Sequence, residues 1–322
     1  MSDARAGNSG RGTPIPVILD CDPGHDDAMA IMLAAAHPAL DLKAVTTVAG
    51  NQTLDKTTLN ARRIATAAGI KGIPVAAGCD RPLSGPPILG DYIHGPSGLD
   101  GPAFGDVEVP LDERHGVALM RDLLTSSQRP VTMIATGPMT NIATLLRDHP
   151  EVTEGIAEIV FMGGSTDRGN FSPYAEFNIA ADPEAAAIVV GSGLPVTMCG
   201  LNVTHQVLVS DTVLGRLRDV DTPLAALCVD LVTFFARTYR DVFRFEYPPL
   251  HDPLAVARVI DPSLVTCEPV HVAIETNGEH TRGATVVDLH GRTGSPANVQ
   301  VAVGVDVEGF WDLMIGAIRA LG

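Results

Sequence analysis

The chain has 322 residues, 45% of them hydrophobic, so it can bury a sizeable core. Its net charge of −16, from 38 acidic and 22 basic side chains, argues against nucleic-acid polymers and anionic membranes as partners and favours a small molecule. Five cysteines without a CxxC spacing argue against a disulfide framework or a zinc site and are typical of a reducing cytoplasm.

Residues 1–13 lack the apolar segment of a signal peptide, and we expect a flexible tail there, followed by one domain at 14–322. In that domain short β-rich runs alternate with Ala- and Leu-rich helical runs, and no apolar stretch reaches the 18 residues or so of a membrane span. The expected strands are 16–20, 42–50, 73–78, 130–137, 158–164, 194–204, 270–276 and 284–290, and the early helices are 26–37 and 53–69.

Most of these strands are continuously apolar, as parallel strands covered on both faces are. The pattern predicts a single α/β domain with a mainly parallel, Rossmann-like open sheet flanked by helices. The Gly- and Pro-rich segment 79–106 is long for a connection, and we expect it to be one of several long active-site loops. Ligands of such sheets bind beyond the carboxyl ends of the strands.

Four aspartates follow the first expected strand, in the stretch VILDCDPGHDDAMAI: Asp20, Asp22, Asp26 and Asp27. One of them can cap the next helix, but capping cannot use all four. Their mutual repulsion is relieved most simply by a divalent cation. Because no histidine and cysteine ligand set accompanies them, the cation should be a hard one, Ca²⁺ or Mg²⁺.

Other acidic motifs fit this stretch less well. An EF-hand loop counted from Asp20 would need Gly and Glu where His25 and Ile31 stand. A phosphatase of the haloacid dehalogenase type would place Thr or Val at Gly24 and would need basic phosphate ligands, which are scarce here. The phosphatase remains an alternative, and a phosphate-binding GxxxxGK[ST] loop is absent from the sequence.

The segment DCDPGHDDAMAI resembles the N-terminal signature of the calcium-dependent, inosine–uridine preferring nucleoside hydrolases. Further blocks are similar to that family in the same order: TTVAGNQ (46–52), IHGPSGLDG (93–101), ATGPMTNIA (135–143), FMGG (161–164), AEFNIAADPEAA (175–186) and HDPLAVA (251–257). The resemblance extends from Pro14 to the C-terminus. It implies hydrolysis of ribonucleosides to ribose and free base, in nucleoside salvage, by a cytoplasmic homodimer or homotetramer.

The resemblance also implies a metal site. Ca²⁺ would be bound by the carboxylates of Asp22, Asp27 and Asp252 and by the main-chain carbonyl of Thr136. Asp26 would act as the general base for a Ca²⁺-bound water that attacks the anomeric carbon. For Asp20 direct ligation and a hydrogen-bonding role both stay open.

The same resemblance assigns the sugar contacts. Asn51 would bind the 2′- and 3′-hydroxyls of the ribose, Asn170, Glu176 and Asn178 would bind the 5′ side, and Met162 would pack beneath the sugar. Glu176 and Asn178 are two residues apart, so in an extended segment they face the same way.

The leaving base needs a proton, and His251 is the family's candidate donor, with His94 placed over the base. Tyr239 and Tyr247 are further candidates for base contacts, whereas His25 and the remaining histidines are expected to be structural or exposed.

Because it has both His94 and His251, the sequence resembles the inosine–uridine or pyrimidine-preferring members of the family. Purine-specific members stack the base between tryptophans, and the single tryptophan of this chain, Trp311, lies near the C-terminus. A non-catalytic Ca²⁺- and ribose-binding protein is the second alternative, and it would need neither Asp26 nor His251.

Overall fold

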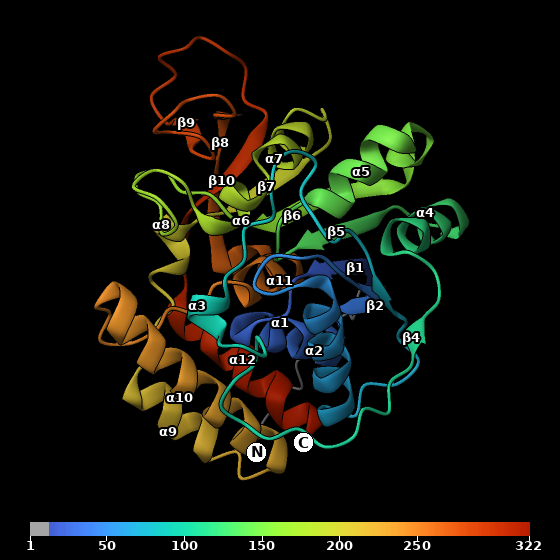
Figure 1. Ribbon diagram of the computed structural model, residues 1–322, viewed down its shortest axis with the longest axis vertical. Helices are drawn as coiled ribbons and strands as arrows, with labels where there is room; N and C mark the ends of the chain where they lie inside the picture. Colours follow the sequence, from blue (N-terminus) through green and yellow to red (C-terminus); the bar gives the residue numbers. More distant parts are fainter. Residues whose placement is uncertain (1–12) are drawn as a thin grey trace, which may run out of the picture.

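A computed structural model describes residues 13–322 (Figure 1), so the tail expected at 1–13 lies, apart from Thr13, outside the described residues. The fold is one α/β domain around a ten-stranded sheet in the order β4-β3-β2-β1-β5-β6-β7-β10-β8-β9. The strands are β1 Ile15–Cys21, β2 Leu40–Thr47, β3 Val75–Ala77, β4 Leu111–Asp112, β5 Val131–Ala135, β6 Ile156–Met162, β7 Val196–Cys199, β8 Val265–Ile274, β9 Thr285–Asp288 and β10 Val299–Val305.

The sheet is parallel from β4 through β10, and only the β10–β8 and β8–β9 pairs are antiparallel. This confirms the predicted single domain with a mainly parallel open sheet. The helices are α1 His25–Ala36, α2 Leu54–Ala67, α3 Asp91–His94, α4 Gly116–Ser126, α5 Thr140–Asp148, α6 Phe177–Ala181, α7 Pro183–Val190, α8 Leu201–Thr204, α9 Asp211–Arg218, α10 Pro223–Phe243, α11 Pro253–Ile260 and α12 Val307–Leu321, with 3₁₀ turns at Pro150–Gly155 and Pro262–Leu264.

The central strand β1 shows why both faces of the sheet are covered. Val17 and Leu19 point into a core cluster with α1, α2, α10, α11 and α12, whereas Ile18 points into a second cluster with α4, α5 and α7. Successive side chains of a strand alternate between its faces, and here both faces are apolar, so the strand is continuously hydrophobic. In Figure 1 the two helical layers lie on opposite sides of the sheet.

Three expectations about local structure were wrong or incomplete. The segment 194–204 is not one strand, because β7 ends at Cys199 and the chain turns at Gly200 into the short helix α8. The strands β4 and β10 were not anticipated. The long segment 79–106 contains the helix α3, which lies at the carboxyl ends of the strands. Among the described residues no helix is long and apolar enough to cross a membrane.

Candidate active site

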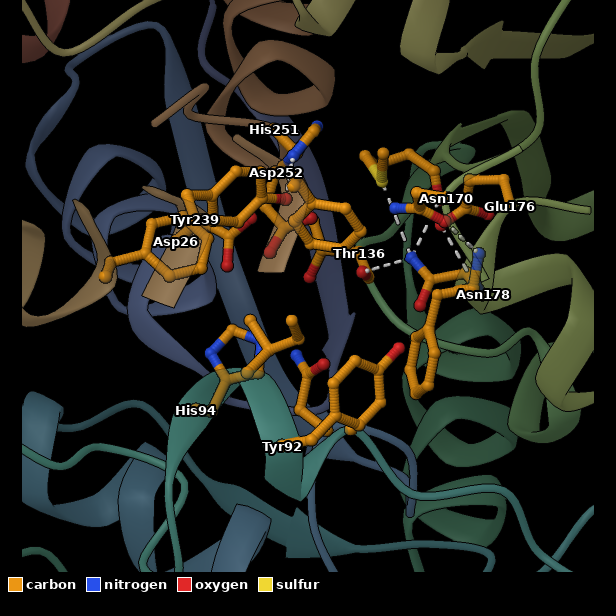
Figure 2. Close-up of a pocket in the computed structure, with 17 residues that line it drawn as sticks. Asp26, Tyr92, His94, Thr136, Asn170, Glu176, Asn178, Tyr239, His251 and Asp252 are labelled. Carbon is orange, nitrogen blue, oxygen red and sulfur yellow. Dashed lines mark hydrogen bonds between the residues drawn. The ribbon is translucent and has the colours of Figure 1, made fainter. Parts of the chain in front are cut away.

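The site lies where β1, β5 and β6 end. Strand β1 ends at Cys21, and the turn Asp22–Gly24 leads directly into α1, so Asp26 and Asp27 fall in the first turn of that helix. Carboxylates there are stabilised by the unpaired N–H groups and the dipole of the helix. Asp252 stands immediately before α11 and faces Asp26 in Figure 2.

The three side chains Asp26, Asp27 and Asp252 form the acidic centre of the site. Each offers a carboxylate oxygen, and these oxygens all lie within 4.8 Å of one another. Burial and the neighbouring Asp27 raise the pKa of Asp26 to about 7. Burial, followed by the charges of Asp26 and Asp27, raises the pKa of Asp252 well above its usual range. The cluster is therefore a centre of uncompensated negative charge.

Asp22 lies outside this trio but next to it. Its Oδ2 accepts a hydrogen bond from the main-chain N–H of Asn51 at 2.7 Å, whereas its Oδ1 is buried without a partner. A Cβ atom at Gly50 or Gly137 would collide with its carboxylate, so only glycine permits this close approach of the backbone. Two glycines of the sequence blocks thus serve to enclose one buried carboxylate.

Asp20 is held away from the trio by neutral partners. Its Oδ1 accepts hydrogen bonds from Thr46 Oγ1 at 2.7 Å and from Asn141 Nδ2 at 2.8 Å. Burial raises its pKa to about 7, against the lowering effect of these two bonds. Its Oδ2 is buried without a partner, as Oδ1 of Asp22 is, so these hydrogen bonds assign only Oδ1 of Asp20 to the floor of the site.

The donor set fits a hard divalent cation. The clustered groups offer carboxylate oxygens only, and none of the residues that line the pocket within 13–322 is a lysine or an arginine. The unpartnered Oδ1 of Asp22 and the raised pKa values of Asp26, Asp27 and Asp252 are what carboxylates placed to bind a divalent cation show. The Thr136 carbonyl accepts a hydrogen bond from Asn178 Nδ2 at 2.8 Å, which leaves one lone pair free.

A second wall of the pocket is built from amides and one buried carboxylate (Figure 2). Glu176 caps α6 by accepting hydrogen bonds from the N–H groups of Gly164, Asn178 and Ile179 at 2.9–3.2 Å, and burial raises its pKa to about 7. Asn178 Nδ2 also donates to the Met162 carbonyl, at 3.1 Å. The wall is therefore rigid before any ligand binds.

Asn51 and Asn170 are fixed in a similar way. Asn51 Nδ2 donates to Asp27 Oδ2 at 3.1 Å, so one side chain links the acidic trio to the pocket surface that Asn51 lines. Asn170 Oδ1 accepts from the N–H of Phe177 at 2.9 Å, which directs its amide group at the pocket. Both residues thus have one polar end held by the protein.

His251 does not stand alone. Its Nδ1 is 2.7 Å from Thr204 Oγ1 and its Nε2 is 2.7 Å from the hydroxyl of Tyr239. Burial lowers the pKa of His251 and raises that of Tyr239, so the imidazole is neutral and the phenol is protonated at neutral pH. The Tyr239 hydroxyl, hydrogen-bonded to His251, is thus the protonated group on this side of the pocket.

His94 closes the pocket from the opposite side, at the end of α3. Its Nδ1 lies 3.0 Å from Nδ1 of His25, and the Nε2 of His25 lies 2.8 Å from the main-chain oxygen of Asp100. His25, expected to be merely structural or exposed, is fully buried and touches a side chain that lines the pocket.

The pocket gathers nearly all the predicted site residues. Asp22 and Asp27 are the exceptions, since both are fully buried behind its surface. Tyr247 lies elsewhere, with its hydroxyl on Asp211. Sequence reasoning missed the aromatic lining and the helix residue that supports His251, namely Tyr92, Phe177, Phe235, Phe243 and Thr204.

Comparison with known proteins identifies the family of the chain. The family model for inosine-uridine preferring nucleoside hydrolases matches residues 17–312. The chain is 50% identical over 305 residues to the pyrimidine-specific ribonucleoside hydrolase RihA of Shewanella woodyi, covering 94% of this chain and 98% of the relative. It is 46% identical to RihA of Salmonella arizonae, covering 96% and 99% of the two chains.

A solved structure is similar in fold over the same range. The purine-preferring ribonucleoside hydrolase of Gardnerella vaginalis superposes with a TM-score of 0.88 at 34% identity, covering 95% of this chain and 98% of that one. The fold and the site thus define a hydrolase of ribonucleosides. The chain belongs to the inosine-uridine preferring nucleoside hydrolase family, which confirms the resemblance read from the sequence blocks.

Proposed function

We propose that this enzyme uses Ca²⁺ to hydrolyse the N-glycosidic bond of pyrimidine ribonucleosides, releasing ribose and free base for nucleoside salvage. The observation that carries the proposal is a single pocket in which the acidic centre faces a neutral proton donor, the Tyr239 hydroxyl. Such a division suits a reaction in which positive charge develops on the sugar and negative charge on the departing base.

The groups that would hold the ion are the carboxylates of Asp22, Asp27 and Asp252 and the carbonyl of Thr136, all buried and all oxygen donors. When bound, Ca²⁺ would neutralise these carboxylates, hold ribose hydroxyls and lower the pKa of a coordinated water molecule. Asn51 supports this arrangement by holding Asp22 and Asp27 through two hydrogen bonds.

Asp26 is the proposed general base. It lines the pocket, whereas Asp22 and Asp27 do not, so it can reach a water molecule beside the anomeric carbon. Its carboxylate takes the proton of that water as the bond to the base breaks, a role worth about 10²–10⁴ in rate. Asp20 is proposed to support the cluster from below through Thr46 and Asn141.

The ribose is proposed to lie between the acidic centre and the amide wall. Asn51 would contact the 2′- and 3′-hydroxyls, and Asn170, Glu176 and Asn178 the 5′ side, with Met162 beneath the ring. Because these polar groups are already hydrogen-bonded within the protein, little ordering is needed when the sugar binds.

The leaving base is proposed to receive its proton from the Tyr239 hydroxyl, backed by His251. Both ring nitrogens of His251 are occupied, by Thr204 and by Tyr239, so the imidazole reaches the pocket through the phenol. A hydrogen bond from Nε2–H to the phenol oxygen stabilises the phenolate that forms as the O–H proton moves to the base.

Preference for pyrimidines is supported by two observations. RihA proteins that are named pyrimidine-specific share 46–50% of their residues with this chain. Trp311, the only tryptophan of the sequence, packs in the core of α12 against Phe310 and does not line the pocket, so no indole is available to stack on a purine.

A chromatographic assay of uridine, cytidine, inosine and adenosine, with Ca²⁺ and with excess chelator, tests the proposal. We expect fast release of uracil and cytosine, slow release of purines, and no turnover in chelator. Uridine 5′-monophosphate should react poorly, because no lysine or arginine of the described residues lines the pocket. Full activity in chelator, or purines as the best substrates, would refute the corresponding part. Nucleoside binding without any cleavage would instead favour the non-catalytic alternative.

A further inference from the structure

The imidazole of His25 is held at both nitrogens by one short loop. Helix α3 ends at His94, and the chain returns through glycines with positive φ at Gly95 and Gly98 to bring the Asp100 carbonyl to the same ring. Nε2 of His25 is 2.8 Å from that carbonyl oxygen, and Nδ1 is 3.0 Å from Nδ1 of His94. The ring therefore connects the start of α1 to the loop that closes the pocket.

The Asp100 carbonyl decides where the proton of His25 resides. A carbonyl oxygen only accepts, so Nε2 of His25 must carry hydrogen. The ring is fully buried and stacks on Phe234, Phe235 and His94 with centroid separations of 5.1–5.5 Å, and no carboxylate of the described residues accepts from it. A ring in these surroundings is neutral, so its Nδ1 is an acceptor.

An acceptor at Nδ1 of His25 requires a donor at Nδ1 of His94. One contact opposes this assignment, since the main-chain N–H of His25 also points at His94 Nδ1, at 3.3 Å. The opposite assignment would need two protons on His25. Burying that cation with no carboxylate hydrogen-bonded to it costs several kcal/mol, which exceeds the roughly 1 kcal/mol of one long hydrogen bond.

The remaining nitrogen of His94 then faces the ligand. Nε2 makes no hydrogen bond to the described residues, yet it is not among their buried unpartnered atoms, so it is open to the pocket that His94 lines. With the proton on Nδ1, this Nε2 carries a free lone pair.

We propose that His25 is a positioning residue that fixes His94 as the Nδ1–H tautomer, so that His94 Nε2 accepts a hydrogen bond from the nucleobase. The proposal rests on the nucleoside hydrolase function proposed above. The base donors it can bind are the N3–H of uracil and the exocyclic amino group of cytosine. It follows that His94 contributes to binding of the base and is not its proton donor.

The direct test is the tautomer itself, in the Ca²⁺-saturated enzyme at pH 8 without substrate. Long-range ¹H–¹⁵N correlation spectra of protein labelled with ¹⁵N-histidine report which ring nitrogen carries hydrogen, and a His94→Gln variant assigns the signals. We expect Nδ1–H on His94 in the wild type and a change to Nε2–H in His25→Phe, which keeps the ring stack but removes the acceptor. An Nε2–H signal in the wild type, or no change in His25→Phe, overturns the proposal.

Steady-state kinetics give an independent readout with a matched control. In His25→Phe we expect KM for uridine to rise at least about tenfold, the scale of one lost hydrogen bond to a base, with kcat changed less than threefold. Phe234→Leu loosens the same stack but keeps both hydrogen bonds of His25, so its tautomer signal and KM should match the wild type. A loss confined to kcat in His25→Phe contradicts the acceptor role.

The tautomer signals need no turnover, so the two proposals fail separately. If no nucleoside is cleaved, the proposed function is wrong, while an Nδ1–H signal on His94 that depends on His25 still supports the positioning role. If nucleosides are cleaved and His94 carries Nε2–H, the positioning role is wrong and the proposed function stands.

Discussion

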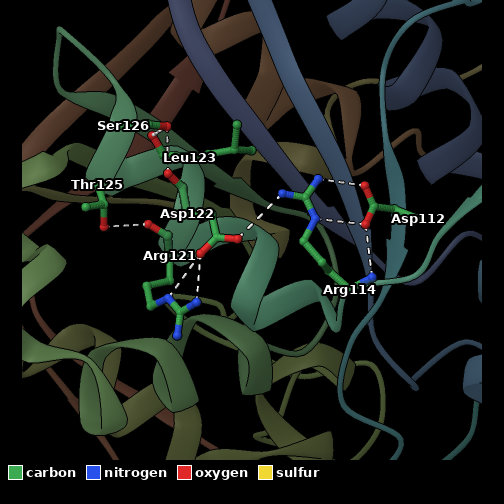
Figure 3. A network of polar contacts seen from close by, with 7 residues as sticks. All are labelled: Asp112, Arg114, Arg121, Asp122, Leu123, Thr125 and Ser126. Carbon is green, nitrogen blue, oxygen red and sulfur yellow. Dashed lines mark hydrogen bonds and ion pairs between the residues drawn. The ribbon is translucent and has the colours of Figure 1, made fainter.

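The aspartates at the pocket and those on the surface between β4 and α4 have opposite electrostatic surroundings and opposite pKa shifts. Asp26 and Asp252 at the pocket are buried beside another carboxylate, and their pKa values are raised. Asp112 at the end of β4 and Asp122 in α4 are partly exposed and paired with arginines (Figure 3). The Arg114 guanidinium lies 2.7 Å from Asp112 and lowers the pKa of that carboxyl to about 2.

The contrast shows that the pocket lacks the positive charge that the surface network contains. In the surface network Arg114 reaches both Asp112 and Asp122, and Arg121 lies 2.8 Å from Asp122, so each negative charge has a cation within the protein. At the pocket, none of the lining residues in the described chain is a lysine or an arginine. Protonation or a bound cation relieves repulsion that the chain leaves uncompensated in its interior, and the proposed Ca²⁺ would supply the cation.

The largest effect should follow from removing the base. We expect Asp26→Asn to lower kcat for uridine by about 10²–10⁴, because the amide keeps the shape of the side chain but cannot take a proton. Nucleoside binding, measured by calorimetry, should persist. The matched control Asp122→Asn removes a carboxylate that has guanidinium partners and should leave kcat unchanged. A loss below tenfold in Asp26→Asn would mean that another group activates the water.

Substitution of Tyr239 separates protonation of the leaving base from the proposed role of Asp26 in activating water. Tyr239→Phe should lower kcat for uridine by about 10², the lower end of the range for a general acid. With p-nitrophenyl riboside the leaving group is p-nitrophenolate, a stable anion that needs no proton, so kcat for this substrate should fall less than threefold in Tyr239→Phe. Asp26→Asn should lower kcat for both substrates. Equal losses of the two substrates in Tyr239→Phe would assign Tyr239 to binding instead.

The β1–α1 segment could be predicted from sequence because its signals are local. The apolar run, the turn at Pro23–Gly24 and the acids of the next helix are adjacent in the chain, and the structure places the helix within one residue of the expected start. The short strand β4 has only two residues and carries no such signal. The segment 194–204 looked uniformly β-rich, but Gly200 ends the strand and lets Leu201 donate to the Gly164 carbonyl.

The contacts of the site's histidines could not be predicted in the same way. His251 and Tyr239 are twelve residues apart but belong to different elements, and the partner Thr204 comes from a helix that was expected to be a strand. His25 meets Asp100 only because the glycine-rich turn after α3 folds back. Such contacts depend on tertiary packing, which neither periodicity nor residue type reveals.

Stability should depend on pH in opposite ways with and without the ion. Without metal, burial raises the pKa of Asp20, Asp26 and Glu176 to about 7. Unfolding returns these groups to values near 4, so between about pH 4 and 7 the folded state holds more protons, and its stability falls as pH rises. Asp22, Asp27 and Asp252 act in the same direction, whereas histidines whose pKa burial lowers, among them His25, His94, His205 and His251, act in the opposite direction below about pH 6.5. Because the acidic groups outnumber these histidines and continue to titrate above pH 6.5, we expect in chelator a lower Tm at pH 8 than at pH 5.5.

Calcium should reverse this trend, because its ligands must be deprotonated to bind. At a free concentration of 100 times the Kd at pH 8, the ion adds about 2.7 kcal/mol to the free energy of unfolding at that pH, and the same concentration should give a smaller gain in Tm at pH 5.5, where binding is weaker. Asp252→Asn removes one carboxylate of the trio and should abolish most of this gain, whereas Asp122→Asn should keep it. A Tm in chelator that climbs between these pH values would contradict the charge state assigned to the cluster.

The smallest effect is expected in the surface network. Asp112 and Arg114 are partly exposed and already paired, so Arg114→Ala should lower Tm by less than calcium raises it. In 1 M NaCl, where the Debye length is about 3 Å, most of the difference in Tm should disappear.

The pH dependence of the stability that the Asp112–Arg114 pair contributes has the opposite sign to that of the pocket carboxylates. Because folding depresses the pKa of Asp112 to about 2, its contribution is present above pH 4 and is lost as pH falls toward 2. Differential scanning fluorimetry of Arg114→Ala and wild type at pH 8 and pH 2.5 should therefore show the difference at pH 8 and its reduction at pH 2.5. A difference that grows in acid, or that resists 1 M salt, would mean that Arg114 acts through packing and not through charge.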